Sequence, residues 1–350
     1  MRFASTRRAV GFTLVELLVV VSIIALLISI LLPSLKTARN QAKAVKCAAN
    51  ARQVGQATSM YLAENSSFFP PSYAYPTTKS GGWSLTVQST SSVPNGYLHW
   101  SYFLYSGGKV KEEAFQCPNF NKGGAPRTNP GPIEDAWNSD QIDDGSNTSP
   151  NTLVDKQAVR MAYTANASII PRNKFTPALS GGQRTNVLVQ ENRVKRPGDT
   201  ILYTEYLSNW RALGVIQSGK ILVKSHRPVN VFYHLGSGAN EYQAPETNPG
   251  FIYGKIGLPK TAEDYGLLAS GVVKNKTNIL DYTSGIPQIN AVGRDHPGGN
   301  DKNFGGTANF TFLDNHVERM TPLESLRTRK WGDRYYSLSG ESEILNMNAQ

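Results

Sequence analysis

Cysteine is scarce in this chain of 350 residues, which contains only Cys47 and Cys117. Two cysteines are too few for the disulfide framework of a small secreted domain, and their spacing matches no zinc-binding motif. The length allows one large domain or two modest ones, with ample material for a hydrophobic core. The 31 glycines and 20 prolines indicate a chain that is rich in loops.

Motifs of catalysis are also missing, because neither H-E-x-x-H nor G-x-S-x-G occurs. A metal site or a hydrolase would have to be built from scattered histidines and nearby aspartates. These are His226, His234, His296, His316, Asp295 and Asp314. A histidine beside an aspartate in a hairpin more often makes a structural hydrogen bond, so we expect no enzyme and no cofactor.

Acidic residues are fewer than basic ones, 26 against 36, which gives a net charge of +10. Such an excess attracts nucleic acid or anionic envelope polymers but says nothing about fold. Part of it recurs at steps of three and four residues, which places it on one face of a helix. This stripe consists of Lys36, Arg39, Lys43 and Lys46. A solvated helix face is the simpler interpretation, and nucleic-acid binding is the alternative.

A long apolar run extends from Leu14 to Leu32 and is interrupted by Glu16 and two serines alone. As a helix it measures about 30 Å, enough to cross the hydrocarbon core of a bilayer. A secretory signal peptide would need a small-residue cleavage site after the run, and residues 33–36 offer none. A plain membrane anchor does not explain Glu16, since an ionisable group is costly there. A third interpretation is that the chain is cut before the run and keeps it.

The residues Gly11-Phe12-Thr13-Leu14-Val15-Glu16, preceded by three arginines, resemble the cleavage and methylation motif of type IV pilins and type II secretion pseudopilins. The resemblance implies that a prepilin peptidase cuts between Gly11 and Phe12 and that Phe12 is N-methylated. Glu16 then occupies the fifth mature position, where the family keeps a carboxylate that acts in filament assembly. Removing the three leader arginines lowers the net charge to +7.

Pro33 falls at the twenty-second mature position, where many pilins carry a proline. It removes a helix hydrogen bond and should bend or loosen the helix there. Small and apolar residues continue at a helical period beyond it, to about residue 64. The turn residues Asn65-Ser66-Ser67 and then Pro70-Pro71 should end this helix.

Several further patches resemble the pilin-like proteins that are abundant in planctomycetes. They are Cys47–Ala57, Phe115–Pro118, Tyr163–Asn166 and Arg196–Tyr203. Cys47 and Cys117 both lie in matching patches, and a head outside the cytoplasm would face an oxidising space. A Cys47–Cys117 disulfide and two buried free thiols both remain open.

The C-terminal region resembles the H-x9-D-G element of the same pilin-like proteins. It contains His296, then Asp314, Asn315 and His316. The gap from His296 to Asp314 is longer than in that element, and Asn315 replaces its glycine. Asparagine tolerates positive φ, so a tight hairpin between strands at 309–313 and 316–320 is expected.

Two oxygen-rich stretches, 140–147 and 295–303, raise the question of calcium, which major pseudopilins of secretion systems bind. Asp295 and Asp301 are the weak candidates in the second stretch. Neither spacing matches an EF-hand, so exposed polar loops are the preferred interpretation.

The expected fold is α+β and pilin-like, with a long N-terminal helix packed on an antiparallel β-rich head. The expected parts are a leader (1–11), a transmembrane and filament-core helix (12–34), a helix continuation packed on the head (35–64), and a head with long loops (65–350). Strands are expected at 200–206, 215–223 and 229–234, and surface loops at 119–132, 138–151 and 245–250.

The expected function is structural: a filament subunit of a type IV pilus-like or type II secretion system. Its partners would be prepilin peptidase, other pilin subunits, the assembly platform and the inner membrane. The N-terminus would be cytoplasmic before assembly, and the head periplasmic or on the cell surface. The alternatives are a DNA-capturing pilin and a membrane-anchored hydrolase or sugar-binding head. The last would use His296 and Asp314 with Trp83, Trp100 and Trp137.

The leader gives the first testable prediction. If Gly11 is the recognition residue, Gly11→Leu should block cleavage and leave the full-length chain in the membrane. Mass spectrometry of the N-terminus checks this, with methylated Phe12 expected at the start of the mature protein. A wild-type chain that stays uncut, or is cut after residue 33, would contradict the pilin interpretation.

Overall fold

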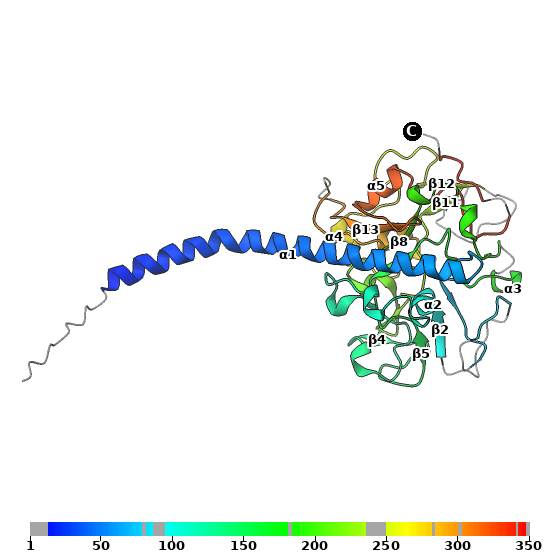
Figure 1. Cartoon of the computed structure of the whole chain (residues 1–350), viewed down its shortest axis with the longest axis horizontal. Helices are drawn as coiled ribbons and strands as arrows, with labels where there is room; N and C mark the ends of the chain where they lie inside the picture. The colour runs from blue at the N-terminus through cyan, green and yellow to red at the C-terminus, as the bar shows by residue number, and fades with distance from the viewer. Residues whose placement is uncertain are drawn as a thin grey trace, which may run out of the picture. The chain divides into compact units, whose positions relative to one another are not determined.

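The structure is a computed structural model that describes residues 13–78, 82–86, 95–180, 184–235, 250–281, 284–299, 303–340 and 342–347. The chain divides into two compact units, one up to Ala42 and one from Lys43 onwards. The helix α1, Leu14–Glu64, belongs to both (Figure 1). The second unit, which we call the head, thus contains the end of α1 together with residues 65–350, which the sequence analysis expected to form the head.

The head combines short strands and short helices with long connections. The other α-helices are α2 Trp100–Tyr105, α3 Pro177–Ser180, α4 Ser270–Val273 and α5 Pro322–Arg327. The strands are β1 Tyr73–Ala74, β2 Asn95–His99, β3 Ala125–Pro126, β4 Gln141–Ile142, β5 Val154–Lys156, β6 Arg160–Met161, β7 Tyr163–Ala165, β8 Ile201–Glu205, β9 Gly214–Gln217, β10 Lys220–Val223, β11 Phe232–His234, β12 Phe251–Tyr253, β13 Ala308–Phe312 and β14 Val317–Met320.

The central sheet is four-stranded and antiparallel, in the order β14-β13-β8-β7. The hairpin expected near the C-terminus is present, since β13 and β14 pair with Phe310 opposite Glu318. Asn315 lies in its turn with φ of +72°, as its replacement of glycine predicted. The smaller sheets are β1-β2-β5, β4-β10-β9, β11-β12 and β3-β6. The α+β, pilin-like fold class is therefore confirmed.

The second part of α1 packs on one face of the central sheet (Figure 1). The Thr58 hydroxyl lies 2.9 Å from the Tyr203 hydroxyl of β8, and Asn309 of β13 donates from Nδ2 to the Ala44 carbonyl at 3.3 Å. Strand residues alternate between the two faces of a sheet. The opposite face carries Phe310, whose ring meets the buried Trp331 ring at 6.1 Å. Strands β7, β8 and β13 are thus buried on both sides.

Small residues allow α1 to approach the sheet closely. Ala44, Cys47, Ala51 and Gly55 follow one another at steps of three and four, and all are buried. A methyl group added at Gly55 would lie 2.9 Å from Thr311 Cγ2 and 3.0 Å from Asn315 Oδ1. Gly55 is needed because it has no side chain, not because of its backbone angles. The helix ends at Glu64, immediately before Asn65-Ser66-Ser67.

Two of the expected strands are shorter than predicted. Residues 215–223 form a hairpin of β9 and β10, because Ser218 and Gly219 have φ of +50° and +74° and reverse the chain. Residues 229–234 contribute only β11 to a paired strand, and Val229 makes an isolated bridge with Asn166. The strand at 200–206 is present as β8.

The prediction of a surface loop at 119–132 is partly wrong, since residues 124–131 are buried. The polar side chains there have partners in the head. Asn129 donates from its backbone N–H to Asp155 Oδ2 at 2.9 Å and from Nδ2 to Asp155 Oδ1 at 2.7 Å. Pairing of this kind lets a polar segment enter the interior, because buried polar groups are stable when they are hydrogen-bonded.

The close contact at Gly55 gives a second prediction. Gly55→Leu should lower the free energy of unfolding by about 1–3 kcal/mol, because the new side chain would overlap Thr311. Gln56→Leu is the matched control: Gln56 is exposed on the same helix turn. Denaturant unfolding of the detergent-solubilised chain, followed by tryptophan fluorescence, measures both. Equal stability of the two variants would show that α1 does not approach the sheet this closely.

Candidate functional site

At the start of α1, Thr13 and Glu16 hydrogen-bond to each other. Gly11 and Phe12 lie outside the described residues, which start at Thr13. The Glu16 carboxylate oxygen Oε2 accepts from the Thr13 backbone N–H at 2.9 Å and from the Thr13 hydroxyl at 2.7 Å. The Glu16 N–H donates to Thr13 Oγ1 at 3.3 Å. This is a capping box, which satisfies backbone donors at the start of a helix.

The sequence analysis gave Glu16 no partner within its own chain, and the structure supplies one in Thr13. Thr13 supplies two donors, although it brings no positive charge. The signal was present, since Thr-x-x-Glu before an apolar run is the sequence pattern of a capping box. The capping box orients Glu16 at the helix start.

The first part of α1 presents apolar side chains on all sides. Every residue from Thr13 to Arg39 is exposed, and Leu14, Ile30 and Leu31 are 79%, 68% and 64% exposed. Among the described residues, α1 is the helix long and apolar enough to cross a membrane. A surface of this size does not remain in water, so lipid or other helices must cover it.

The serines within the run are satisfied by the helix itself. Ser22 and Ser29 donate to the carbonyls of Leu18 and Leu26, each at 2.7 Å. Of the polar side chains in the run, Glu16 is the one that carries a charge. The helix continues through Pro33, and the bend expected there stays a prediction.

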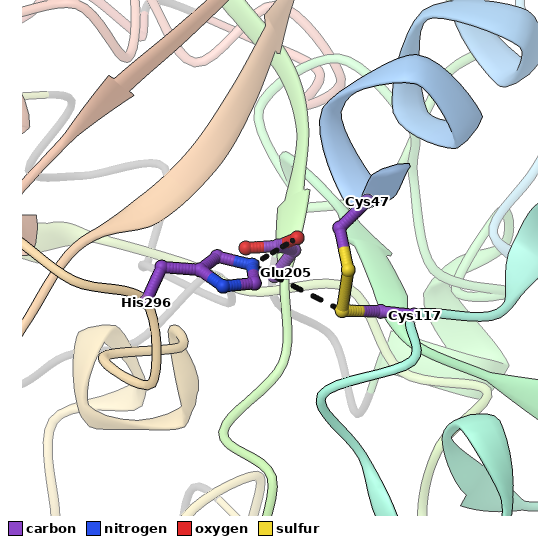
Figure 2. A group of neighbouring side chains, drawn as sticks. All are labelled: Cys47, Cys117, Glu205 and His296. Carbon is purple, nitrogen blue, oxygen red and sulfur yellow. Dashed lines mark hydrogen bonds and ion pairs between the residues drawn. A yellow bond between two sulfur atoms is a disulfide. The ribbon is translucent and has the colours of Figure 1, made fainter. Parts of the chain in front are cut away.

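The Cys47–Cys117 disulfide joins α1 to the segment that follows the short helix Glu112–Phe115. Figure 2 shows His296 and Glu205 beside it. His296 Nε2 lies 3.9 Å from Cys117 Sγ and 2.9 Å from Glu205 Oε1. We call Cys47, Cys117, Glu205 and His296 the disulfide cluster. All four residues are buried, with at most 4% of the surface of any of them exposed.

The Glu205 carboxylate is held by further donors. Asn309 donates from its backbone N–H to Oε2 at 2.8 Å and from Nδ2 to Oε1 at 2.9 Å. The Tyr163 hydroxyl donates to the Cys47 carbonyl at 2.8 Å. Burial, together with the negative charge of Glu205, raises the pKa of Tyr163 well above its usual value, so this phenol stays protonated. The result is a hydrogen-bonded link between α1 and three strands.

His296 and Asp314 of the C-terminal element do not form one site. His296 is buried beside Glu205, whereas Asp314 lies in the β13–β14 turn with its Oδ1 2.5 Å from His316 Nδ1. Asn315 of the same turn donates from Nδ2 to Ser59 Oγ of α1 at 2.9 Å. The expected histidine–aspartate hydrogen bond is thus made by His316, and the turn also contacts α1.

The tryptophans proposed for sugar binding lie mainly in the interior. Trp100 and Trp137 are 1% and 7% exposed. Trp100 stacks on Tyr203 at 4.4 Å between ring centres, and Trp137 donates from Nε1 to the Gly131 carbonyl at 2.9 Å. Only Trp83 of the three is partly exposed. Trp100 and Trp137 therefore pack in the core.

The calcium candidates are engaged by hydrogen-bond donors where they are described. Asp295 Oδ2 accepts from the Ser208 N–H at 2.9 Å, and Asp301 lies outside the described residues. In the other stretch, Asn147 donates from its N–H and Nδ2 to Asp143, and Asn151 donates from Nδ2 to it. The described carboxylates Asp295 and Asp143 thus accept hydrogen bonds from backbone and side-chain amides.

The basic stripe lies on α1, where Lys36, Arg39 and Lys46 are exposed and Lys43 is half-buried. Nucleic-acid binding by this stripe rests on its positive charge alone and stays a prediction.

Sequence reasoning missed Glu205 and Asn309. Glu205 ends an otherwise uncharged strand, Ile201–Glu205, all of which is buried. A glutamate in such a strand was a usable signal, since an ionised carboxylate enters a core only with donors around it. Nothing local indicated that the donors would be Asn309 and His296, which follow about a hundred residues later.

Comparisons with known proteins match the N-terminal part of the chain. Residues 7–32 fit the family model described as the prokaryotic N-terminal methylation motif. Over 96 residues the chain is 32% identical to the type II secretion system core protein G of Vibrio cholerae serotype O1. This match covers 27% of the chain and 61% of that relative. No solved structure matches the chain significantly. These matches and the α+β architecture support a pilin- or pseudopilin-like protein.

Proposed function

We propose that the mature chain is a structural subunit of a type II secretion pseudopilus or a type IV pilus-like filament. The observation that carries this proposal is the first part of α1, which is apolar and exposed and lies within the match to the methylation motif. The relative from Vibrio cholerae is named as a component of a type II secretion system, which favours the same function.

Two environments can cover the exposed part of α1. In the inner membrane, lipid chains surround it while the subunit waits, with the leader on the cytoplasmic side and the head in the periplasm. In a filament, the apolar helices of neighbouring subunits replace the lipid. Van der Waals packing between helices then supplies the association energy. The partners are prepilin peptidase, an assembly platform and further copies of pilin-like chains, and the role is not catalytic.

Glu16 sets the register of the incoming subunit in this proposal. Cleavage after Gly11 exposes the α-amine of Phe12, a positive charge that can meet the carboxylate of a neighbour. Both hydrogen bonds from Thr13 go to Oε2 of Glu16. The other oxygen, Oε1, can therefore receive the amine without breaking the capping box. Losing one partner of a buried ion pair typically costs about 3–5 kcal/mol.

The head must stay attached to α1 when the helix leaves the membrane. The Cys47–Cys117 disulfide and the contacts of Tyr163 and Asn309 with α1 provide this attachment. A covalent link between helix and head suits a subunit whose helix is drawn into a filament core.

The disulfide gives a third prediction. It closes a loop with a sequence separation of 70 residues, so replacing both cysteines by serine should lower the free energy of unfolding by about 4 kcal/mol. Denaturant unfolding of the variant and of the wild type measures this. Thiol labelling of the denatured, unreduced wild type should find no free thiol, and reduction should release two. Two labelled thiols before reduction would refute the bond.

A fourth prediction separates the charge of Glu16 from its capping role. Glu16→Val removes both, whereas Glu16→Gln keeps a residue that can complete the capping box and removes only the charge. Both variants should be inserted and cleaved normally, and both should lose or shorten the filaments. Mass spectrometry of the N-terminus and electron microscopy of sheared filaments measure the two steps.

The control for Glu16 is Ser22→Val, because Ser22 bonds only within its own helix and its loss should leave filaments unchanged. A normal filament yield from Glu16→Gln would overturn the charge pairing and leave the capping box as the role of Glu16. Absence of filaments from the wild type under every assembly condition tested would count against the filament proposal itself.

A further inference from the structure

The disulfide cluster contains the donor atoms of a tetrahedral metal site. The ligand atoms of Cys47, Cys117, Glu205 and His296 all lie within 4.8 Å of one another. While the two sulfurs are joined, neither is a thiolate, and the cluster is a disulfide beside a carboxylate–imidazole pair (Figure 2). Reduction would place two thiols beside an imidazole and a carboxylate in a closed, buried space.

We propose that, when its disulfide is reduced, the head binds one Zn²⁺ ion through the disulfide cluster. A dithiol supplies the two electrons and two protons that convert the disulfide to two thiols, and is itself oxidised to a disulfide. Binding of Zn²⁺ then displaces the two thiol protons to solvent and forms two zinc–sulfur bonds. The site is gated by redox state and goes beyond the filament function, which does not depend on it.

The donor set favours zinc over other common metals. Two thiolates and one imidazole are the ligands that structural zinc sites use, and a carboxylate completes a set of four. Hard cations such as calcium and magnesium prefer sites made of oxygen atoms. The bound ion would carry a total charge of −1 with its ligands, close to that of the carboxylate already buried there.

The distances need only small adjustments. In a tetrahedral zinc site, neighbouring donor atoms are separated by about 3.3–3.8 Å, as follows from the usual zinc–ligand bond lengths. His296 Nε2 and Cys117 Sγ are 3.9 Å apart, and His296 Nε2 and Glu205 Oε1 are 2.9 Å apart. Opening the sulfur–sulfur bond lets the two sulfurs separate to a similar spacing by side-chain rotation.

The surroundings of the cluster support metal binding. Asn309 holds both oxygens of Glu205, at 2.8 and 2.9 Å, and this orients the carboxylate in the way that outer-shell groups orient metal ligands. His296 Nδ1 is buried without a hydrogen-bond partner among the described residues. In the oxidised head the imidazole proton lies on Nε2, which donates to Glu205 Oε1. The ion replaces this proton on Nε2, and the buried Nδ1 then carries the ring proton.

The four ligands come from positions that the fold already holds. Cys47 is on α1 and Glu205 on β8. His296 exchanges two backbone hydrogen bonds with Thr307, each of 3.0 Å, and the Cys117 N–H donates to the Gly123 carbonyl at 2.9 Å. The site is therefore preorganised, which is what a closed metal site requires.

Co²⁺ is a suitable probe, since its tetrahedral thiolate complexes absorb in the visible and near-ultraviolet ranges and Zn²⁺ displaces it. The full mature chain in detergent is reduced with excess dithiothreitol, freed of it by anaerobic gel filtration and titrated with Co²⁺. We expect one ion per reduced chain with the spectrum of tetrahedral thiolate coordination, and none in the oxidised chain. Zn²⁺ should raise the Tm of the reduced chain only.

Variants test the individual ligands. His296→Ala and Glu205→Gln should each weaken binding to the reduced chain by about 10-fold or more. The half-buried His316, which lies in the β13–β14 turn, is the control, and His316→Ala should bind like the wild type. Circular dichroism in the near-ultraviolet range shows whether each reduced protein keeps its tertiary structure.

Three results would overturn the proposal. The first is a reduced, folded chain that binds no Co²⁺. The second is a reduced chain that unfolds and is not refolded by Zn²⁺. The third is unchanged affinity in both His296→Ala and Glu205→Gln, which would mean that the thiolates bind the ion elsewhere in a rearranged chain.

Discussion

The close packing of α1 on the central sheet is the constraint on which the rest of the head depends. The first part of α1 is apolar on all sides, and its second part has small residues on the face that meets the sheet. Gly55 brings the helix against Thr311, and the space beneath Cys47 receives the Glu205 carboxylate. A buried carboxylate is stable only when donors surround it. Asn309 and His296 supply those donors, so the β13 strand and the loop before it are fixed by the same requirement.

Several contacts between α1 and the sheet are hydrogen bonds. Thr58 meets Tyr203, Tyr163 donates to the Cys47 carbonyl, and Asn309 donates to the Ala44 carbonyl. Each hydrogen bond contributes only about 0.5–1.5 kcal/mol to the stability of the fold. Their main effect is to fix the orientation of the helix on the sheet. Because hydrogen bonds are directional, they hold the helix in one register on the sheet. The disulfide adds a covalent bond between the helix and the head. In the proposed filament function, the helix moves between lipid and protein, and a fixed connection of this kind keeps the head attached to it.

The sequence predicted the elements whose signals are local. The apolar run, the helix to residue 64 and the hairpin around Asn315 each follow from spacing or from the preference of one residue, and the structure contains all three. It was less successful where tertiary contacts change the outcome. Residues 124–131 have the composition of a surface loop but are buried, because Asn129 finds its partner in Asp155. The run 215–223 resembles one strand, and a two-residue turn divides it.

The sequence by itself determined the N-terminal motif, the membrane-length helix and the pilin-like class, because these depend on residues that are neighbours along the chain. Only the tertiary structure decided which side chains meet. His296 pairs with Glu205 and not with Asp314, and Trp100 and Trp137 lie in the core instead of on a binding surface. The physical reason is that a buried polar group takes whichever partner the packed elements bring within reach. Cys47, Cys117, Glu205 and His296 are spread over 250 positions of the sequence, and packing of α1 on the sheet brings them together.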